Sequence, residues 1–156
     1  MENVMPLSDA ATKLLRESFD LAVEHEPSLA ERFYQKLFAR APQLAHMFRR
    51  DRAAQAEMLR AALVAVIDHI DNGPWLRATL GALGARHVTY GVTPEMYDEV
   101  GGALVTTLEE ACGARWTTAH ARAWGDAYAA IVTMMLQGAA EAEPEVASPW
   151  RATGLR

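Results

Sequence analysis

Apolar residues recur along this chain at intervals of three and four positions, which is the spacing of one face of an α-helix. No stretch alternates apolar and polar residues for long enough to predict a β-strand. Ser8 can cap a first helix, and Pro27 suits the first turn of a second. Ala41-Pro42 interrupts the second helix, because proline disfavours helical geometry in the residue before it. The predicted inward faces are Ala11, Leu14, Leu15, Ser18, Phe19, Ala22 and Val23 in the first helix, and Leu29, Phe33, Tyr34, Leu37 and Phe38 in the second.

Further breaks divide the rest of the chain into four more helices. The third is expected from about Arg52 to Ile70, and Asn72-Gly73-Pro74 ends it. The fourth stops around Tyr90-Gly91, Thr93-Pro94 begins the fifth, and Thr117 or Thr118 opens the last. The predicted inward faces are Met58, Leu59, Ala62, Leu63, Val66, Ile67 and Ile70 in the third helix, and Leu76, Leu80, Leu83 and His87 in the fourth. In the fifth they are Met96, Tyr97, Val100, Leu104 and Leu108, and in the last Trp124, Tyr128, Ile131, Val132 and Met135. Residues 138–156 show no sustained period, so we expect one domain over 1–137 followed by a flexible tail.

Composition and charge narrow the class of protein. The chain has 156 residues, of which 51% are hydrophobic and 22% charged, and this favours one soluble globular domain. A net charge of −5 argues against nucleic-acid binding, which needs a dense basic surface. The longest purely apolar run, residues 61–67, is too short to span a membrane, and the first residues lack the pattern of a signal peptide. We therefore expect a cytoplasmic protein.

The single cysteine, Cys112, limits the covalent chemistry of the chain. One cysteine cannot form an internal disulfide, and it fits a reducing compartment. It also excludes Cys-rich zinc sites and the Cys-x-x-Cys-His attachment of a c-type haem. Any cofactor must therefore be held without a thioether bond.

His87 is the most informative candidate for chemistry. It continues the leucine stripe at positions 76, 80 and 83, so its ring should point into the core. A neutral imidazole there has two ring nitrogens to satisfy. His87 is therefore either a core histidine bonded to a backbone carbonyl, or a metal ligand whose second nitrogen donates to such a carbonyl. The other histidines (25, 46, 69 and 120) give no reason to pair with it in a two-histidine site.

Tyr34 and Gln55 are polar residues where helical spacing places their neighbours inward. Tyr34 lies between Phe33 and Leu37, and Gln55 lies one turn before Leu59. One interpretation leaves the Tyr34 hydroxyl in water and Gln55 on the surface. The other makes them two hydrogen-bond donors that face a pocket together with His87 on a separate helix.

Four segments in register resemble the single-domain bacterial globins and the globin half of flavohaemoglobins. They are FYQKLFARAPQLAHMF, QAEML, ALGARHVTYGVTPEMYDEVGGALV and RAWGDAYAAI, and the similarity covers roughly Leu14 to Gln137. Each segment alone is a weak signal, but four in the same order make a strong one. The resemblance implies an all-α globin fold, a three-over-three helical sandwich around one non-covalent haem b.

The resemblance also implies a role for individual residues. His87 matches the proximal iron ligand, and Phe48 matches the phenylalanine that wedges against the haem. Tyr34 and Gln55 match the distal tyrosine and glutamine. The remaining matches are Leu59 over the iron, Arg86 beside the ligand, Tyr97 on the proximal side, and Trp124 and Tyr128 as packing residues of the last helix.

Two departures from flavohaemoglobins bear on function. Their last helix carries a glutamate that joins the proximal histidine and tyrosine, and the matching position here is Ala139, so only Glu141 could replace it. The chain also shows no flavin- or nicotinamide-binding segment and no Gly-rich phosphate loop. The segment between Phe48 and Gln55 is shorter as well, which trims a surface corner.

The resemblance implies a haem protein that binds oxygen reversibly and with high affinity, stabilised by Tyr34 and Gln55. Carbon monoxide and nitric oxide are further expected ligands. One alternative is a nitric oxide dioxygenase that detoxifies nitric oxide with electrons from a separate reductase, and whether the protein is an enzyme stays open. A second alternative is a gas sensor acting through a partner protein. Outside the globin interpretation, the chain would be a helical interaction module without a cofactor.

Overall fold

The computed structural model describes residues 7–48 and 51–153, with side chains described as far as Glu141. Within these residues the chain is helical and contains no strand, which confirms the all-α prediction. The elements are α1 (Asp9–His25), α2 (Leu29–Arg40), the 3-10 helix η1 (Pro42–Met47), α3 (Arg52–Asp68), α4 (Gly73–Thr89), α5 (Pro94–Cys112), the 3-10 helix η2 (Gly113–Arg115) and α6 (Thr118–Thr153). No helix among the described residues is long and apolar enough to cross a membrane.

Short polar side chains cap α1 at Ser8, as predicted, and α4 at Asn72, whereas Pro27, expected in the first turn of α2, lies before that helix. The Ser8 hydroxyl accepts a hydrogen bond from the Ala11 amide at 3.0 Å, and Asn72 accepts one from the Trp75 amide at 3.1 Å. Each bond satisfies an amide that has no partner within its own helix. Gly91 follows the end of α4 and Gly113 follows the end of α5. Their φ angles of 88° and 62° lie in the left-handed region, which glycine adopts without steric cost.

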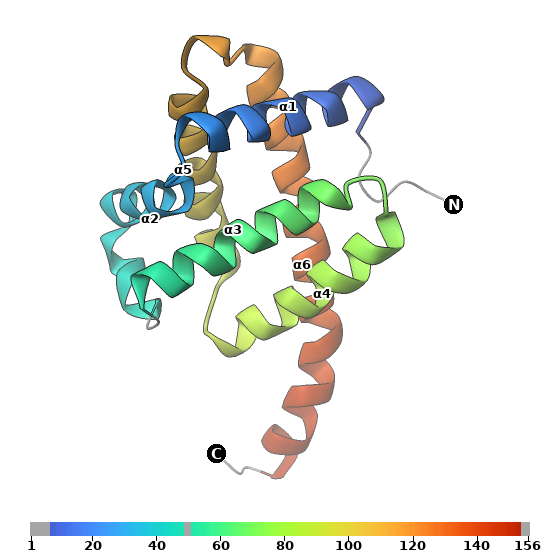
Figure 1. The fold of residues 1–156 in the computed structure, drawn as a ribbon. Coiled ribbons are helices and arrows are strands. Elements are labelled where there is room, and N and C mark those ends of the chain that lie inside the picture. The colour runs from blue at the N-terminus through green and yellow to red at the C-terminus, as the bar shows by residue number, and fades with distance from the viewer. Residues whose placement is uncertain (1–6, 49–50, 154–156) are drawn as a thin grey trace.

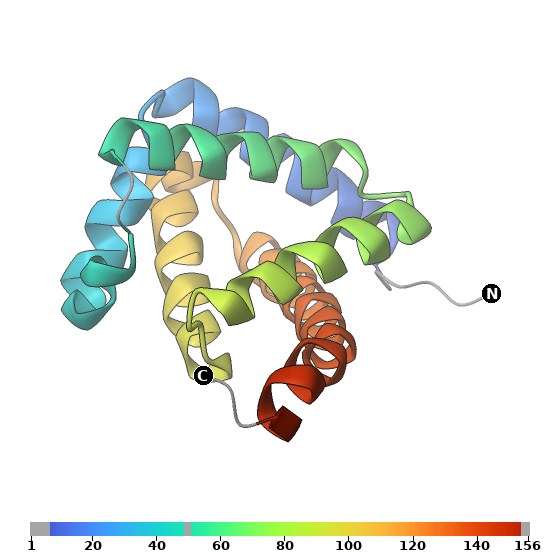
Figure 2. The same ribbon diagram turned by 90° about the horizontal axis from the view of Figure 1, so that it is seen from below.

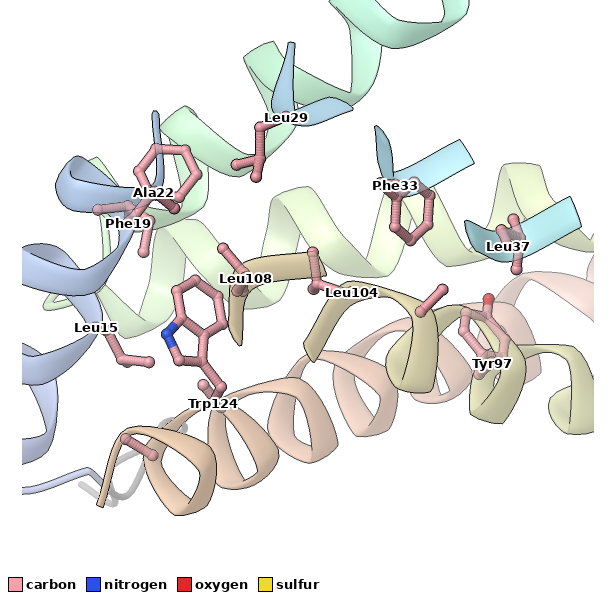
Figure 3. Packing of buried hydrophobic residues seen from close by; sticks show 14 of the residues in the cluster. Leu15, Phe19, Ala22, Leu29, Phe33, Leu37, Tyr97, Leu104, Leu108 and Trp124 are labelled. Carbon is pink, nitrogen blue, oxygen red and sulfur yellow. The ribbon is translucent and has the colours of Figure 1, made fainter. Parts of the chain in front are cut away.

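The core forms where α1 and α2 pack against α5 and α6 (Figure 3). Leu15 and Leu108 are fully buried, and the Trp124 ring lies between them and Phe19 in the close-up. A hydrogen bond of 2.8 Å from the Trp124 indole Nε1 to the Ser18 hydroxyl oxygen crosses this core. The Ser18 hydroxyl in turn donates to the Leu14 carbonyl at 2.7 Å, so each buried polar atom of this chain of bonds has a partner.

Helices α3 and α4 diverge from the short turn that joins them, as both ribbon views show (Figures 1 and 2). α3 packs against α2, whereas α4 packs extensively against α6. The side chains of α3 that face the rest of the molecule are consequently only partly covered, including Leu59, Leu63 and Val66. The expected wide apolar face is wrong at Met58, which is 48% exposed, and at Ala62, which is also exposed. An evenly apolar helix does not specify which of its faces turns inward.

The last helix extends further than the sequence pattern indicates. α6 continues past Gln137, where we expected a tail to begin, to Thr153. It extends beyond the other helices in Figure 1. Ala139 is buried and Gly138 contacts α4 at Gly81, so these two residues pack with the helical body.

Candidate functional site

His87 lies in the last turn of α4, where its ring is half-buried. Its Nδ1 lies 2.9 Å from the Leu83 carbonyl oxygen, and a carbonyl only accepts, so Nδ1 carries the proton. Nε2 then presents its lone pair and has no hydrogen-bond partner among the described residues. Burial lowers the pKa of the imidazole, the Leu83 carbonyl opposes this shift, and the Arg86 charge adds to it. A neutral ring with Nδ1 tied to a carbonyl and Nε2 free fits a metal ligand, and the carbonyl bond by itself also fits a core histidine.

Aromatic rings from α5 and the end of α4 surround His87. The buried Tyr97 ring lies nearly parallel to the imidazole, with centroids 6.4 Å apart and planes 20° apart. Tyr90 lies 5.8 Å away but is 59% exposed. The Tyr128 hydroxyl donates to the Tyr97 backbone carbonyl at 2.6 Å and ties α6 to α5 beside the histidine. Arg86, which we predicted beside the ligand, is exposed and acts on His87 through its charge.

Tyr34 and Gln55 come together from two helices. Tyr34 on α2 is only 3% exposed, and the Gln55 side-chain amide on α3 donates to its hydroxyl at 3.3 Å. A surface position for this pair is therefore wrong, since Gln55 is also half-buried. Burial raises the pKa of the Tyr34 phenol, and the hydrogen bond from Gln55 partly opposes that shift. The phenol therefore keeps its proton at neutral pH and can donate it.

Phenylalanine rings pack around Tyr34 at the corner between α2 and α3. Phe48 meets Tyr34 edge to face, with centroids 5.3 Å apart. It meets Phe38 in the same way, also at 5.3 Å. The Arg52 guanidinium lies 5.0 Å above the Phe38 ring. The sequence indicated a site role for Phe48. Phe38 stood out only by its helical spacing, and no pattern in the sequence pointed to Arg52.

The helices that carry these two groups also carry half-buried apolar side chains, which fit a flat apolar cofactor. Leu59, one turn after Gln55, is half-buried and packs against the core. Half-buried apolar side chains from three helices accompany it, namely Leu63 and Val66 of α3, Leu83 of α4, and Met96 and Val100 of α5. Together with the unpartnered Nε2 of His87, they provide one nitrogen ligand in an apolar setting, which is what a haem requires.

Two features lie apart from this group. Ala139 is buried while Glu141 is exposed, so the carboxylate of Glu141 does not replace the glutamate that the resemblance leads one to look for. A surface hollow lies at the start of α1 beside the α3–α4 turn. It is lined by charged and polar side chains and includes none of the predicted site residues: Asp9, Thr12, Lys13, Arg16, Glu17 and Asp71. Among the residues that the structure covers, no three or more His, Cys, Asp or Glu side chains gather as a metal site.

The family model described as "Globin" matches residues 31–135, which include most of α2, all of α3, α4 and α5, and the predicted site residues. This chain belongs to the globin family. Membership implies a haem cofactor and is consistent with the binding of diatomic gases. It also confirms the globin fold that the resemblance implied.

Curated relatives of this globin include two bacterial flavohemoproteins. The protein of Vibrio cholerae is 29% identical over 125 residues, which cover 78% of this chain and 32% of the relative. The protein of Rhizobium meliloti is 27% identical over 132 residues, which cover 83% and 33%. The globin therefore spans about a third of the length of the curated relatives that it matches.

Solved structures with the same fold are also bacterial. An engineered carbene transferase, made from a putative nitric oxide dioxygenase of Rhodothermus marinus, matches with a TM-score of 0.79 and 26% identity over 90% of the globin and 99% of that chain. A bacterial globin from Campylobacter jejuni matches with a TM-score of 0.71 and 20% identity, over 86% and 97% of the two chains. At this lower identity, the second match bears on the fold alone.

Proposed function

We propose that this globin holds a non-covalent haem b through His87 and binds oxygen reversibly with high affinity. The observation that carries the proposal is the pairing of a buried Tyr34 hydroxyl with the Gln55 amide on the α3 side, while His87 on α4 presents an unpartnered Nε2. Two hydrogen-bond donors and one nitrogen ligand thus come from separate helices, and α3 and α4 also carry partly covered apolar side chains.

His87 would supply the ligand to the cofactor. Its bond to the Leu83 carbonyl fixes both the tautomer and the orientation of the ring, so Nε2 stays available. When bound, haem supplies an iron centre that takes up diatomic gases at its open position. Phe48 and Leu59 would pack against the cofactor, Tyr97 would lie against the histidine, and Arg86 beside it.

Tyr34 and Gln55 would act on the gas. The Gln55 amide already donates to the Tyr34 oxygen, so the hydroxyl proton of Tyr34 is left to donate elsewhere. A diatomic gas that gained partial negative charge on binding would be stabilised by the Tyr34 donor, whereas the empty site would not. A hydrogen bond of about 1–2 kcal/mol slows oxygen release by about five- to thirtyfold. The bond therefore favours tight holding over easy unloading.

Replacement of His87 by Ala tests the assignment of the ligand. We expect the purified variant to lose the strong violet absorption band of haem, because it lacks the nitrogen that we propose as the iron ligand. The matched control is His69→Ala, since His69 makes the same Nδ1 contact with the carbonyl four residues earlier, at 2.8 Å from Ala65. A wild-type protein that shows no such band after haem is offered, or a His87→Ala variant that keeps it, contradicts the proposal.

A second candidate function is nitric oxide dioxygenase activity, favoured by the similarity to the Rhodothermus protein. In that reaction one nitric oxide, one oxygen and one electron give one nitrate. The electron would come from a separate reductase, and we place both proteins in the cytoplasm, where the free Cys112 stays reduced. The test is nitric oxide consumption by the haem-loaded protein with NADH and a generic reductase. A rate no faster than that of the reductase alone contradicts this candidate.

A further inference from the structure

Helices α4 and α6 touch through their backbones at two glycines. A Cβ atom built on Gly84 would overlap the backbone carbonyl oxygen of Met135, and one built on Gly138 would overlap the backbone of Gly81. Side chains usually keep packed helix axes 8–10 Å apart, and glycine, which has no side chain, allows the closest approach. Gly81 itself is different, because a Cβ there would lie an ordinary 3.6 Å from the Gly138 Cα.

This contact lies in the turn of α4 that orients His87. Gly84 stands three residues before the histidine and directly after Leu83, whose carbonyl holds the imidazole Nδ1. The contacts found for the imidazole are the Leu83 carbonyl and the rings of Tyr90 and Tyr97, none of which belongs to α6. The α6 backbone therefore meets α4 at Gly84, within the turn that holds His87.

Helix α5 has its own attachment to α6. The Tyr128 hydroxyl donates to the Tyr97 carbonyl, and the Tyr128 ring lies so close to Gly101 that a Cβ there would meet it. Tyr97 is thus held against α6 independently of α4. If α4 moved away from α6, His87 would move relative to Tyr97 and to the partly covered apolar side chains around it.

We propose that Gly84 and Gly138 are positioning residues for His87, and that their missing side chains set the distance between the imidazole and the haem. This inference rests on the proposed binding of haem by His87. A methyl group at either position must separate α4 from α6 by on the order of 1 Å, because the atoms that it meets are backbone and cannot rotate away. Misplacement of a reacting group by that amount is enough to change its chemistry strongly.

The experiment compares four alanine variants of the haem-loaded protein. In Gly84→Ala and Gly138→Ala the new methyl group overlaps the backbone of the other helix. The matched controls are Gly81→Ala on α4, where the methyl group makes an ordinary contact, and Gly125→Ala on α6, where it meets open space. The first readout is the iron–histidine stretching band of the ferrous protein in resonance Raman spectra. The second is the rate of haem transfer to an excess of a haem-scavenging protein. We expect the band to shift and haem loss to quicken at least about tenfold in the first pair, with both unchanged in the controls.

A fifth variant distinguishes a general loss of stability from a displacement of His87. Leu15 is fully buried on α1 and comes from a different helix, so Leu15→Ala should lower the unfolding midpoint and leave the band in place. If Gly84→Ala does not fold, Gly138→Ala carries the test from the other helix. A wild-type band in the folded overlap variants overturns the positioning role while the haem assignment stands. A wild-type protein that takes up no haem overturns the proposed function, and this inference with it.

Discussion

Replacement of Tyr34 by Phe isolates a single hydroxyl group. The Tyr34 ring is enclosed by Phe33, Phe38 and Phe48, with centroids 5.0, 5.9 and 5.3 Å away. Since only 3% of the residue is exposed, a phenylalanine ring should occupy the same space. The substitution therefore removes one donor and one acceptor without opening a cavity.

The expected magnitude follows from the one hydrogen bond that we propose Tyr34 donates to the gas. The loss of about 1.4 kcal/mol corresponds to a tenfold change in an equilibrium constant. Oxygen release should therefore be at least about tenfold faster in Tyr34→Phe. Gln55 loses the hydroxyl to which its amide donates, and a half-buried amide without an acceptor costs on the order of 1 kcal/mol of folding stability.

The assay is stopped-flow measurement of oxygen release, with carbon monoxide as an internal control. Bound carbon monoxide carries less charge than bound oxygen, so its release should change much less. Tyr90→Phe is the matched control, because the Tyr90 ring is 59% exposed and its hydroxyl lies outside the Tyr34–Gln55 pair. Oxygen release that stays at the wild-type rate in Tyr34→Phe would remove Tyr34 from the gas-binding side. An equal acceleration for both gases would point to a steric change instead of a lost hydrogen bond.

Two further predictions concern the scaffold. Ser18→Ala should lower the free energy of unfolding by about 1–3 kcal/mol, because the buried Trp124 indole loses its acceptor. Urea unfolding measures this loss. If the losses of Ser18→Ala and Trp124→Phe simply add in the double variant, the result argues against the bond. Burial raises the pKa of the Tyr128 phenol, with smaller contributions from the charges of Tyr97 and Asp98. Above pH of about 10 the unfolded chain therefore loses a proton that the folded chain keeps, and stability should fall by up to about 1.4 kcal/mol per pH unit. Tyr128→Phe should make the fall in the urea midpoint between pH 9 and 11 shallower; an equally steep fall would show that this phenol does not set it.

Local signals in the sequence were sufficient for several of the helix ends. Ser8, Asn72 and Gly91 mark helix ends through bonds or angles that involve only their immediate neighbours. The same holds for His87, whose place on the leucine stripe and bond to Leu83 both lie within one helix. Such features can be read from order along the chain, because the partners are at most four residues apart.

Local signals could not predict which residues of different helices come into contact. The spacing that suggested an inward Tyr34 could not show that Gln55 would reach it, because the angle between α2 and α3 depends on packing. The same spacing assigned Met58 to the core, yet α3 is apolar on several faces and turns Met58 outward. It also gave no sign that α6 would continue to Thr153.

By itself, the sequence determined the order of the helices, most of their ends and, through the resemblance of four segments, the globin family and the residues to examine. Only the tertiary structure decided how close those residues come to one another. The clearest case is the contact of Gly84 with Met135. The local sequence of α4 does not indicate that Gly84 lies against a backbone carbonyl of α6. Helix formation is governed by neighbours in sequence, whereas the distance between helices is governed by the volume of side chains that meet only in the folded molecule.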